Sequence, residues 1–161
     1  MVVNELVRDI VPSEFEGTTV TFINMPLRES ALPNTPPEGP LILAAILRNF
    51  GAETHIIDLN AYRIKDETAT QRNLPNGRHL TYNEAEQMFL KHLHNVGDQD
   101  IVAFSGKITT LRWQEEMAKI VRRHQPNAFL VSGNGLATEI RMGLFNWIPE
   151  LDAIARSEGD D

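Results

Sequence analysis

The sequence contains no cysteine in its 161 residues, and this excludes several kinds of site at once. Disulfides, thiolate zinc sites, iron–sulfur ligation and a cysteine nucleophile all require that side chain. Long apolar runs are also missing, since the longest, residues 41–47, is far too short to span a membrane. The amino-terminal stretch carries acidic residues and no apolar core of a signal peptide. We therefore expect a cytoplasmic protein that does not bind membranes.

Positive charge is scarce, because 15 lysines and arginines face 22 acidic residues and leave a net charge of −7. Nucleic acid does not attract a chain of this charge, so we do not expect it as a partner. A histidine metal pair is not expected either, since His92 and His94 are two residues apart and point to different faces of a helix. No G-x-G-x-x-G follows the first expected strand, and no P-loop occurs anywhere in the sequence.

Strand patterns alternate with helix patterns along the chain. Apolar, β-branched runs predict strands over residues 18–24, 54–59, 101–104, 129–131 and 153–155. Helices are predicted over residues 41–50, 81–95, 111–124 and 139–147. This alternation is typical of parallel βαβ units. The sequence therefore predicts an α/β fold of the flavodoxin-like (Rossmann-like) type, an open parallel sheet of about five strands with helices on both faces.

The domain organisation is simple. Residues 1–17 are expected to be a short lead-in, and residues 18–161 a single domain. Four prolines between residues 25 and 39 predict a loop, and the helix over 41–50 is apolar nearly all round, as expected of a buried helix. Thr81 and Glu84 form the T-x-x-E signature of a capping box at the start of the next helix.

Candidate binding residues follow the first, third and fourth expected strands. Ligands of open α/β sheets bind at the carboxyl ends of strands, where the strand order reverses. Small residues there let a ligand approach the backbone, and hydroxyls and amides can bond to it. The alternative is that these segments are a self-capping helix start and an ordinary tight turn. The candidates are Pro26, Leu27, Arg28, Ser105, Gly106, Lys107, Ile108, Thr109, Ser132, Gly133, Asn134 and Gly135.

Four segments together carry a family resemblance. Residues 36–47 (PPEGPLILAAIL), with Gly51 and IID at 56–58, resemble the P-P-x-G-x-x-x-L-A-A-x-L…G…(I/V)-x-D pattern that opens the cobalamin-binding domain of radical-SAM enzymes. AFSGKIT at 103–109 is similar to the S-x-L loop of B12 domains, and LVSG at 130–133 to a strand ending in a glycine pair. IPELD at 148–152 with SEGD at 157–160 resembles the P-x-(I/L)-D…G-E-G-(E/D) ending.

The resemblance implies that the domain binds cobalamin through the candidate residues. The residues after the third strand would line the corrin or the nucleotide tail, those after the fourth would admit the tail, and those after the first would cover another edge. The D-x-H-x-x-G motif that supplies a histidine to cobalt is absent, so the implied cofactor is base-off without a histidine ligand. Two positions depart from the pattern: Lys107 replaces the apolar residue of S-x-L, and Ser132 replaces the first glycine.

The resemblance also implies a partner. In this family a radical-SAM catalytic domain, in many cases a methyltransferase, binds S-adenosylmethionine and a [4Fe–4S] cluster held by C-x-x-x-C-x-x-C, a motif this sequence does not contain. That domain would act in the same protein or in trans, because this chain alone carries no catalytic motif. Two alternatives remain: a flavin- or nucleotide-binding module on the same fold, and a degenerate domain that binds no cofactor and serves as an interaction module.

Overall fold

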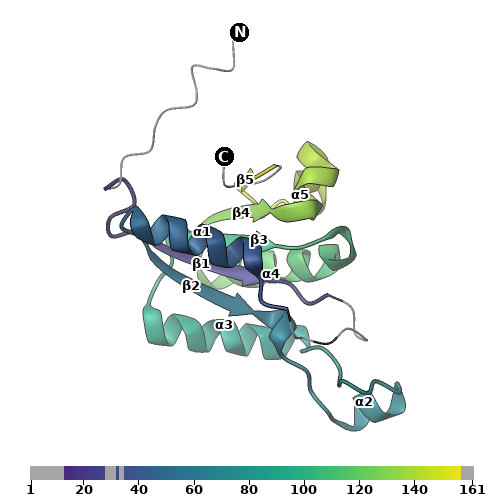
Figure 1. Cartoon of the computed structure of the whole chain (residues 1–161). Helices are drawn as coiled ribbons and strands as arrows, with labels where there is room; N and C mark the ends of the chain where they lie inside the picture. The colour runs from purple at the N-terminus through teal and green to yellow at the C-terminus, as the bar shows by residue number, and fades with distance from the viewer. Residues whose placement is uncertain (1–12, 28–31, 33–34, 157–161) are drawn as a thin grey trace.

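The computed structural model describes residues 13–27, 32 and 35–156, and these contain one five-stranded parallel sheet (Figure 1). The strand order is β2-β1-β3-β4-β5, so it reverses between β1 and β3. The strands are β1 (Thr19–Asn24), β2 (Glu53–Asp58), β3 (Ile101–Ser105), β4 (Phe129–Gly133) and β5 (Ala153–Ile154). This architecture confirms the predicted flavodoxin-like α/β fold. Most of the expected lead-in, Arg28 and residues 157–161 lie outside the described residues.

The helices follow the strands in alternation. They are α1 (Glu38–Asn49), α2 (Glu67–Gln71), α3 (Tyr82–Val96), α4 (Leu111–His124), α5 (Asn134–Ile140) and α6 (Leu144–Trp147), with short 3-10 turns η2 (Leu59–Ala61), η3 (Ile108–Thr110) and η4 (Arg141–Gly143). Helix α4 has the predicted bounds, and α3 begins with the predicted capping box between Thr81 and Glu84. None of these helices is long and apolar enough to cross a membrane.

The main core lies on one face of the sheet, beneath α3, α4, α5 and α6. Ile23, Val102, Phe104 and Leu130 point to this face, and each is at most 2% exposed. Phe89 of α3, Met117 of α4 and Leu136 of α5 pack against them from above. Because side chains alternate along a strand, the neighbouring residues of β1, β3 and β4 point to the opposite face.

The opposite face is only partly covered, and here the predicted burial of the first helix is wrong. Helix α1 packs on β1 and β2 through Ala44 and its neighbours, whereas Leu41 and Ile42 are 44% and 52% exposed. On the same face, Phe129 of β4 is 47% exposed. Figure 1 shows α1 alone in front of the sheet. The helix is therefore buried on one side only.

Helix α1 also begins at Glu38, three residues earlier than predicted. Pro40 lies in the first turn of this helix. The N–H groups of a first turn have no acceptor within the helix, so proline removes no hydrogen bond at that position. Glu38 and Gly39 of the predicted loop therefore belong to the helix.

Residues 59–80 form an excursion that leaves the sheet and carries α2 (Figure 1). An antiparallel bridge pairs Ile64 with Arg78, and the Arg78 guanidinium bonds to Asp66 at 2.7 Å and to Glu84 at 2.8 Å. The Arg78 hydrogen bonds lower the pKa of Glu84 to about 2. Sequence analysis predicted neither α2 nor this bridge, because the contacts join residues that no local periodicity relates. The arginine ties the excursion to the start of α3.

A polar cluster is buried between β1 and α3. The Thr21 hydroxyl donates to Gln99 Oε1 at 2.6 Å, so His92 Nε2, 2.8 Å away, must be the donor of its hydrogen bond to Thr21 Oγ1. The His55 ring lies edge-on to His92 with a centroid distance of 5.1 Å. Burial lowers the pKa of His92, and repulsion from His55 lowers it further.

The His92 pKa predicts how stability depends on pH. The folded state holds the His92 proton less tightly than the unfolded chain, so the free energy of unfolding should fall as pH drops through about 6.5, the ordinary histidine value. Urea unfolding at pH 8 and pH 5.5 measures this fall. In His92→Gln the fall should be smaller, whereas His94→Gln, at an exposed site on the same helix, should behave as wild type. An equal fall in the free energy of unfolding for wild type and His92→Gln would contradict this role of His92.

Candidate functional site

The carboxyl ends of three strands meet at the point where the strand order reverses. The register pairs Asn24 of β1 with Ser105 of β3, and Ser105 with Gly133 of β4. The three residues therefore lie side by side at one edge, as expected for the ligand-binding edge of an open parallel sheet. Beyond this edge the chain continues into the segments singled out from the sequence.

A groove opens at this edge on the partly covered face, between α1 and α5. Its volume is about 540 Å³. Its floor is the end of β3 and β4, and its walls come from the two helices. We call it the α1–α5 groove; it is lined by Phe22, Gly39, Pro40, Leu43, Ala103, Phe104, Ser105, Gly133, Asn134, Gly135, Thr138, Glu139 and Ala155.

Four of the twelve candidate residues line the α1–α5 groove: Ser105, Gly133, Asn134 and Gly135. The residues after β4 do not form the expected loop, since the strand runs to Gly133 and helix α5 starts at Asn134. The helix predicted over 139–147 is in fact two short helices separated by η4. Gly133 has a φ of −129°, which any residue can adopt, so its role is to leave space.

Ser132 lies on the other face of the sheet. Its side chain is fully buried, and its hydroxyl donates to Gln114 Oε1 of α4 at 2.7 Å. The hydroxymethyl group therefore does not narrow the groove. Sequence analysis ended the strand at Val131, which hid the alternation that places residues 132 and 133 on opposite faces.

The segment after β3 divides into a buried and an exposed part. Gly106 is buried, whereas Lys107, Ile108 and Thr109 are exposed at the strand-end edge and do not line the groove. The Thr110 hydroxyl accepts from the Lys107 N–H at 3.0 Å and donates to the Lys107 carbonyl at 2.8 Å. This segment thus caps itself, which was the simpler alternative, while still presenting an apolar side chain, Ile108, to solvent.

The segment after β1 is held by the end of β2. Pro26 is buried, and Leu27 is exposed while its N–H donates to Asn60 Oδ1 at 3.0 Å. Asn24 in turn donates to Asp58 Oδ1 at 2.8 Å. Pro26 and Leu27 follow the carboxyl end of β1, and neither of them lines the groove.

Sequence analysis missed the α1 wall and most of the groove floor. Gly39 was predicted in a loop, Leu43 in a buried helix and Pro40 in neither, although all three line the groove. Phe22 and Ala103 could have been found, because strand alternation places them on the same face as each other. The floor of the groove therefore follows from the alternation of side chains along the strands. The α1 wall instead depends on how far α1 extends over the sheet.

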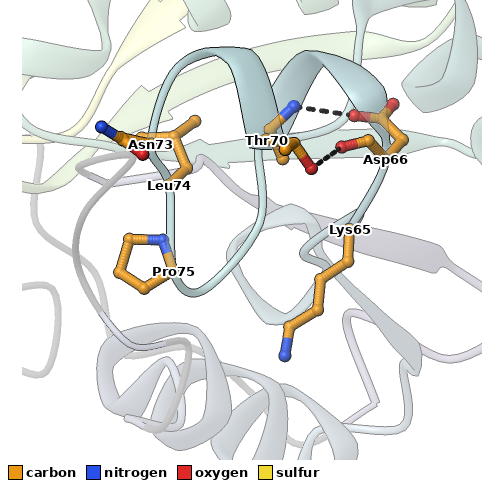
Figure 2. A pocket seen from close by; sticks show the side chains of 7 residues that line it. Lys65, Asp66, Thr70, Asn73, Leu74 and Pro75 are labelled. Atoms are coloured by element: carbon orange, nitrogen blue, oxygen red, sulfur yellow. Dashed lines mark hydrogen bonds between the residues drawn. The ribbon is translucent and has the colours of Figure 1, made fainter.

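A second cavity, of about 470 Å³, lies beside α2 in the excursion (Figure 2). The Thr70 hydroxyl donates to the Asp66 main-chain oxygen at 3.0 Å, and the Asp66 carboxylate is committed to Arg78 and to the Ala69 N–H. In Figure 2 the Lys65 side chain extends away from Asp66. Local hydrogen bonds already use the acidic group here, so this cavity is a weaker candidate than the α1–α5 groove.

No described residues form a cluster of three histidines or carboxylates able to hold a metal ion. The residues lining the groove include no histidine. The sequence matches no protein-family model, and no curated protein matches it either.

Gly106 provides a test of the packing beneath the strand-end edge. A Cβ at this position would overlap the Thr110 hydroxyl and lie 3.3 Å from Gln114 Nε2. We expect Gly106→Ala to lower the free energy of unfolding by about 1–3 kcal/mol, as overpacking of a close-packed site does. Gly135→Ala is the matched control, because no atom lies within 4 Å of that Cβ and alanine favours a helix. Urea denaturation measures both; a Gly106→Ala protein as stable as wild type would refute the close packing.

Proposed function

We propose that this domain binds base-off cobalamin without a histidine ligand, with the nucleotide tail of the cofactor in the α1–α5 groove. The observation that carries the proposal is that segments far apart in the sequence meet at one groove. Three of the four segments that carry the family resemblance contribute to the groove. Segment 36–47 contributes Pro40 and Leu43, segment 103–109 contributes Ser105, and segment 130–133 contributes Gly133. Segments far apart in the sequence thus supply one site, which is how a binding site differs from three unrelated turns.

The dimensions and chemistry of the groove fit such a tail. Its volume of about 540 Å³ lies within the usual range of cofactor and ligand sites. Its lining combines apolar side chains with the polar side chains of Ser105, Asn134, Thr138 and Glu139. A Cβ on Gly133 would lie 3.8 Å from the Ala155 Cβ, so glycine keeps the floor open at this point.

The chemistry of such a protein belongs to the cofactor, and the chain supplies orientation and access. Leu27 and Ile108, which follow the carboxyl ends of β1 and β3, are exposed, and in this proposal they pack against the corrin. The proposed partner is a radical-SAM catalytic domain, in the same protein or in trans, which would carry S-adenosylmethionine and the [4Fe–4S] cluster and act as a methyltransferase.

Cofactor retention tests the proposal directly. After incubation with hydroxocobalamin, the domain should elute from gel filtration with near-stoichiometric corrin absorbance, because the groove buries part of the ligand. The absorption spectrum of the protein peak measures the ratio. Protein that elutes free of corrin, at concentrations well above micromolar, would refute cobalamin binding.

Gly133 tests where the tail lies. A leucine at this position would fill the groove floor, so we expect Gly133→Leu to weaken cobalamin binding at least tenfold in equilibrium titrations. Gly133→Ala is the control, since its Cβ would meet its nearest neighbours at 3.8 and 4.0 Å, an ordinary contact distance. Both variants should fold, because the φ of −129° suits any residue. Wild-type affinity in folded Gly133→Leu would place the tail elsewhere.

The open face of the sheet favours a second candidate function. Parallel sheets are usually covered on both faces, yet Phe129 and Val131 of β4 remain accessible. A domain without cofactor could bind its catalytic partner through this apolar surface, and apo-protein in the retention experiment would favour that function. The flavin or nucleotide alternative has no such support, because no G-x-G-x-x-G follows β1 and no P-loop occurs in the sequence.

A further inference from the structure

The face of the sheet that carries α1 becomes less buried with distance from that helix. The register aligns Val20 of β1, Ile101 of β3 and Phe129 of β4 in one row, and residues in register point to the same face. Val20 is 1% exposed, Ile101 is half-buried, and Phe129 is 47% exposed. The next row on this face shows the same trend, from buried Phe22 to half-buried residues of β3, β4 and β5.

We call the less buried part of these two rows the β3–β5 surface. It consists of Ile101, Ala103, Phe129, Val131 and Ala153. These side chains are all apolar, and a parallel sheet usually has such a surface covered by another element. Apolar area exposed to water costs free energy in proportion to its size, so a segment with a matching apolar side is stabilised by covering it.

The chain enters the sheet on this same face. Phe15 is half-buried and packs against the small apolar cluster beneath α1. The turn that carries it, residues 13–17, lies next to the end of α1, since a Cβ on Gly51 would be 3.2 Å from the Cα of Glu16. This turn leads into the amino end of β1, and Phe129 begins β4 at the same end of the sheet. The segment that precedes the turn therefore starts close to the β3–β5 surface.

That segment has the sequence pattern of an amphipathic helix. Residues 1–12 read MVVNELVRDIVP and lie outside the described residues. Apolar residues recur in pairs every four positions, so at about 100° per residue they occupy one half of a helix and the polar residues the other. The strict alternation of a half-buried strand is absent. The apolar half comprises Val2, Val3, Leu6, Val7, Ile10 and Val11, and the polar half Asn4, Glu5, Arg8 and Asp9.

The length of this segment matches the β3–β5 surface. A helix over residues 2–11 would be about 15 Å long, close to the length of a five-residue strand, which is about 17 Å. Pro12 would end it, because the residue before a proline disfavours the helical conformation. So short a segment, rich in valine, does not form a stable helix alone in water. Such a helix therefore depends on packing against the sheet.

We infer that residues 2–11 form an amphipathic helix that docks on the β3–β5 surface beside α1. Its apolar half covers Phe129 and the neighbouring side chains, and its polar half faces water. The inference is independent of cobalamin binding, since it assigns to this surface an occupant from the same chain. A partner domain reaches the surface only by displacing the segment, so the two compete for one site.

The absence of cysteine makes a single engineered thiol a specific reporter of this contact. Phe129→Cys places the thiol on the β3–β5 surface, and Thr68→Cys places one at an exposed position of α2 as the control. In the full chain we expect a water-soluble maleimide to modify Phe129→Cys about tenfold more slowly than Thr68→Cys, because a covered thiol reacts only when its cover opens. Deletion of residues 2–11 should abolish this difference and leave the rate at Thr68→Cys unchanged.

Substitutions within the segment test which half of the helix docks. Ile10→Asp puts a carboxylate in the apolar half, so it should raise the rate at Phe129→Cys about as much as the deletion does. Asn4→Asp adds the same charge to the polar half and should leave that rate unchanged. Circular dichroism should show less helix in the deleted chain and in Ile10→Asp, and as much as wild type in Asn4→Asp.

Three results would overturn the inference. Equal rates at Phe129→Cys and Thr68→Cys in the full chain would mean that the surface is uncovered, and this comparison holds even if the deleted chain does not fold. Protection of Phe129→Cys that survives the deletion and rises with protein concentration, with a dimer in light scattering, would assign the surface to a second copy. Equal effects of Ile10→Asp and Asn4→Asp would mean that the apolar half of the segment does not dock.

Discussion

The alternation of side chains along β3 and β4 governs both the core and the groove. Phe104 and Ser132 point to the face that α3, α4 and α5 cover, where they are almost completely buried. Ala103, Ser105 and Gly133 point to the other face, where α1 leaves room. A shift of one residue in either strand would exchange these two sets, removing the core and the groove together. The stability of the sheet and the shape of the site are therefore consequences of the same register.

The two faces of the sheet therefore differ, since one carries the main core and the other carries the groove. One face holds nearly all the large buried side chains, and its helices pack on one another as well as on the sheet, for example α3 on α4. The other face has a small cluster under α1 and remains open beyond it. This division lets residues of the groove be small or polar without loss of the main core. Asn134 illustrates the point, because it holds a left-handed conformation at the groove while Leu136, two residues later, is fully buried.

The fold was predictable from the sequence because its signals are local. The capping box at Thr81 and Glu84 set the start of α3, and Pro126 set the end of α4. The start of α5 was not predictable in the same way, since Gly133 and Gly135 indicate a turn, whereas Asn134 passes from strand to helix in one residue. This error also misplaced Ser132, which was taken for a loop residue. The excursion was missed because its arginine network depends on contacts across the fold.

The candidate site was predictable only in part for the same reason, because strand ends have local signals in the sequence and contacts between elements do not. Ser105 and the residues after β4 were identified because strand ends are recognisable in the sequence, and the structure brings them together. The position of the α1 wall depends on packing between elements, so Pro40 and Leu43 were not identified as groove residues. Both residues line the groove because of where α1 lies on the sheet.

The brevity of β5 has a consequence for strand pairing at the edge of the sheet. This strand has two residues, so the edge of the sheet next to the open apolar face offers few unpaired backbone groups. Another strand has little to pair with there, and continuous extension of the sheet from chain to chain is discouraged. Arg122 reinforces this ending by bonding to Asp152, just before the strand, at 2.8 Å. The exposed apolar face is thus bordered by an edge that offers little to another strand.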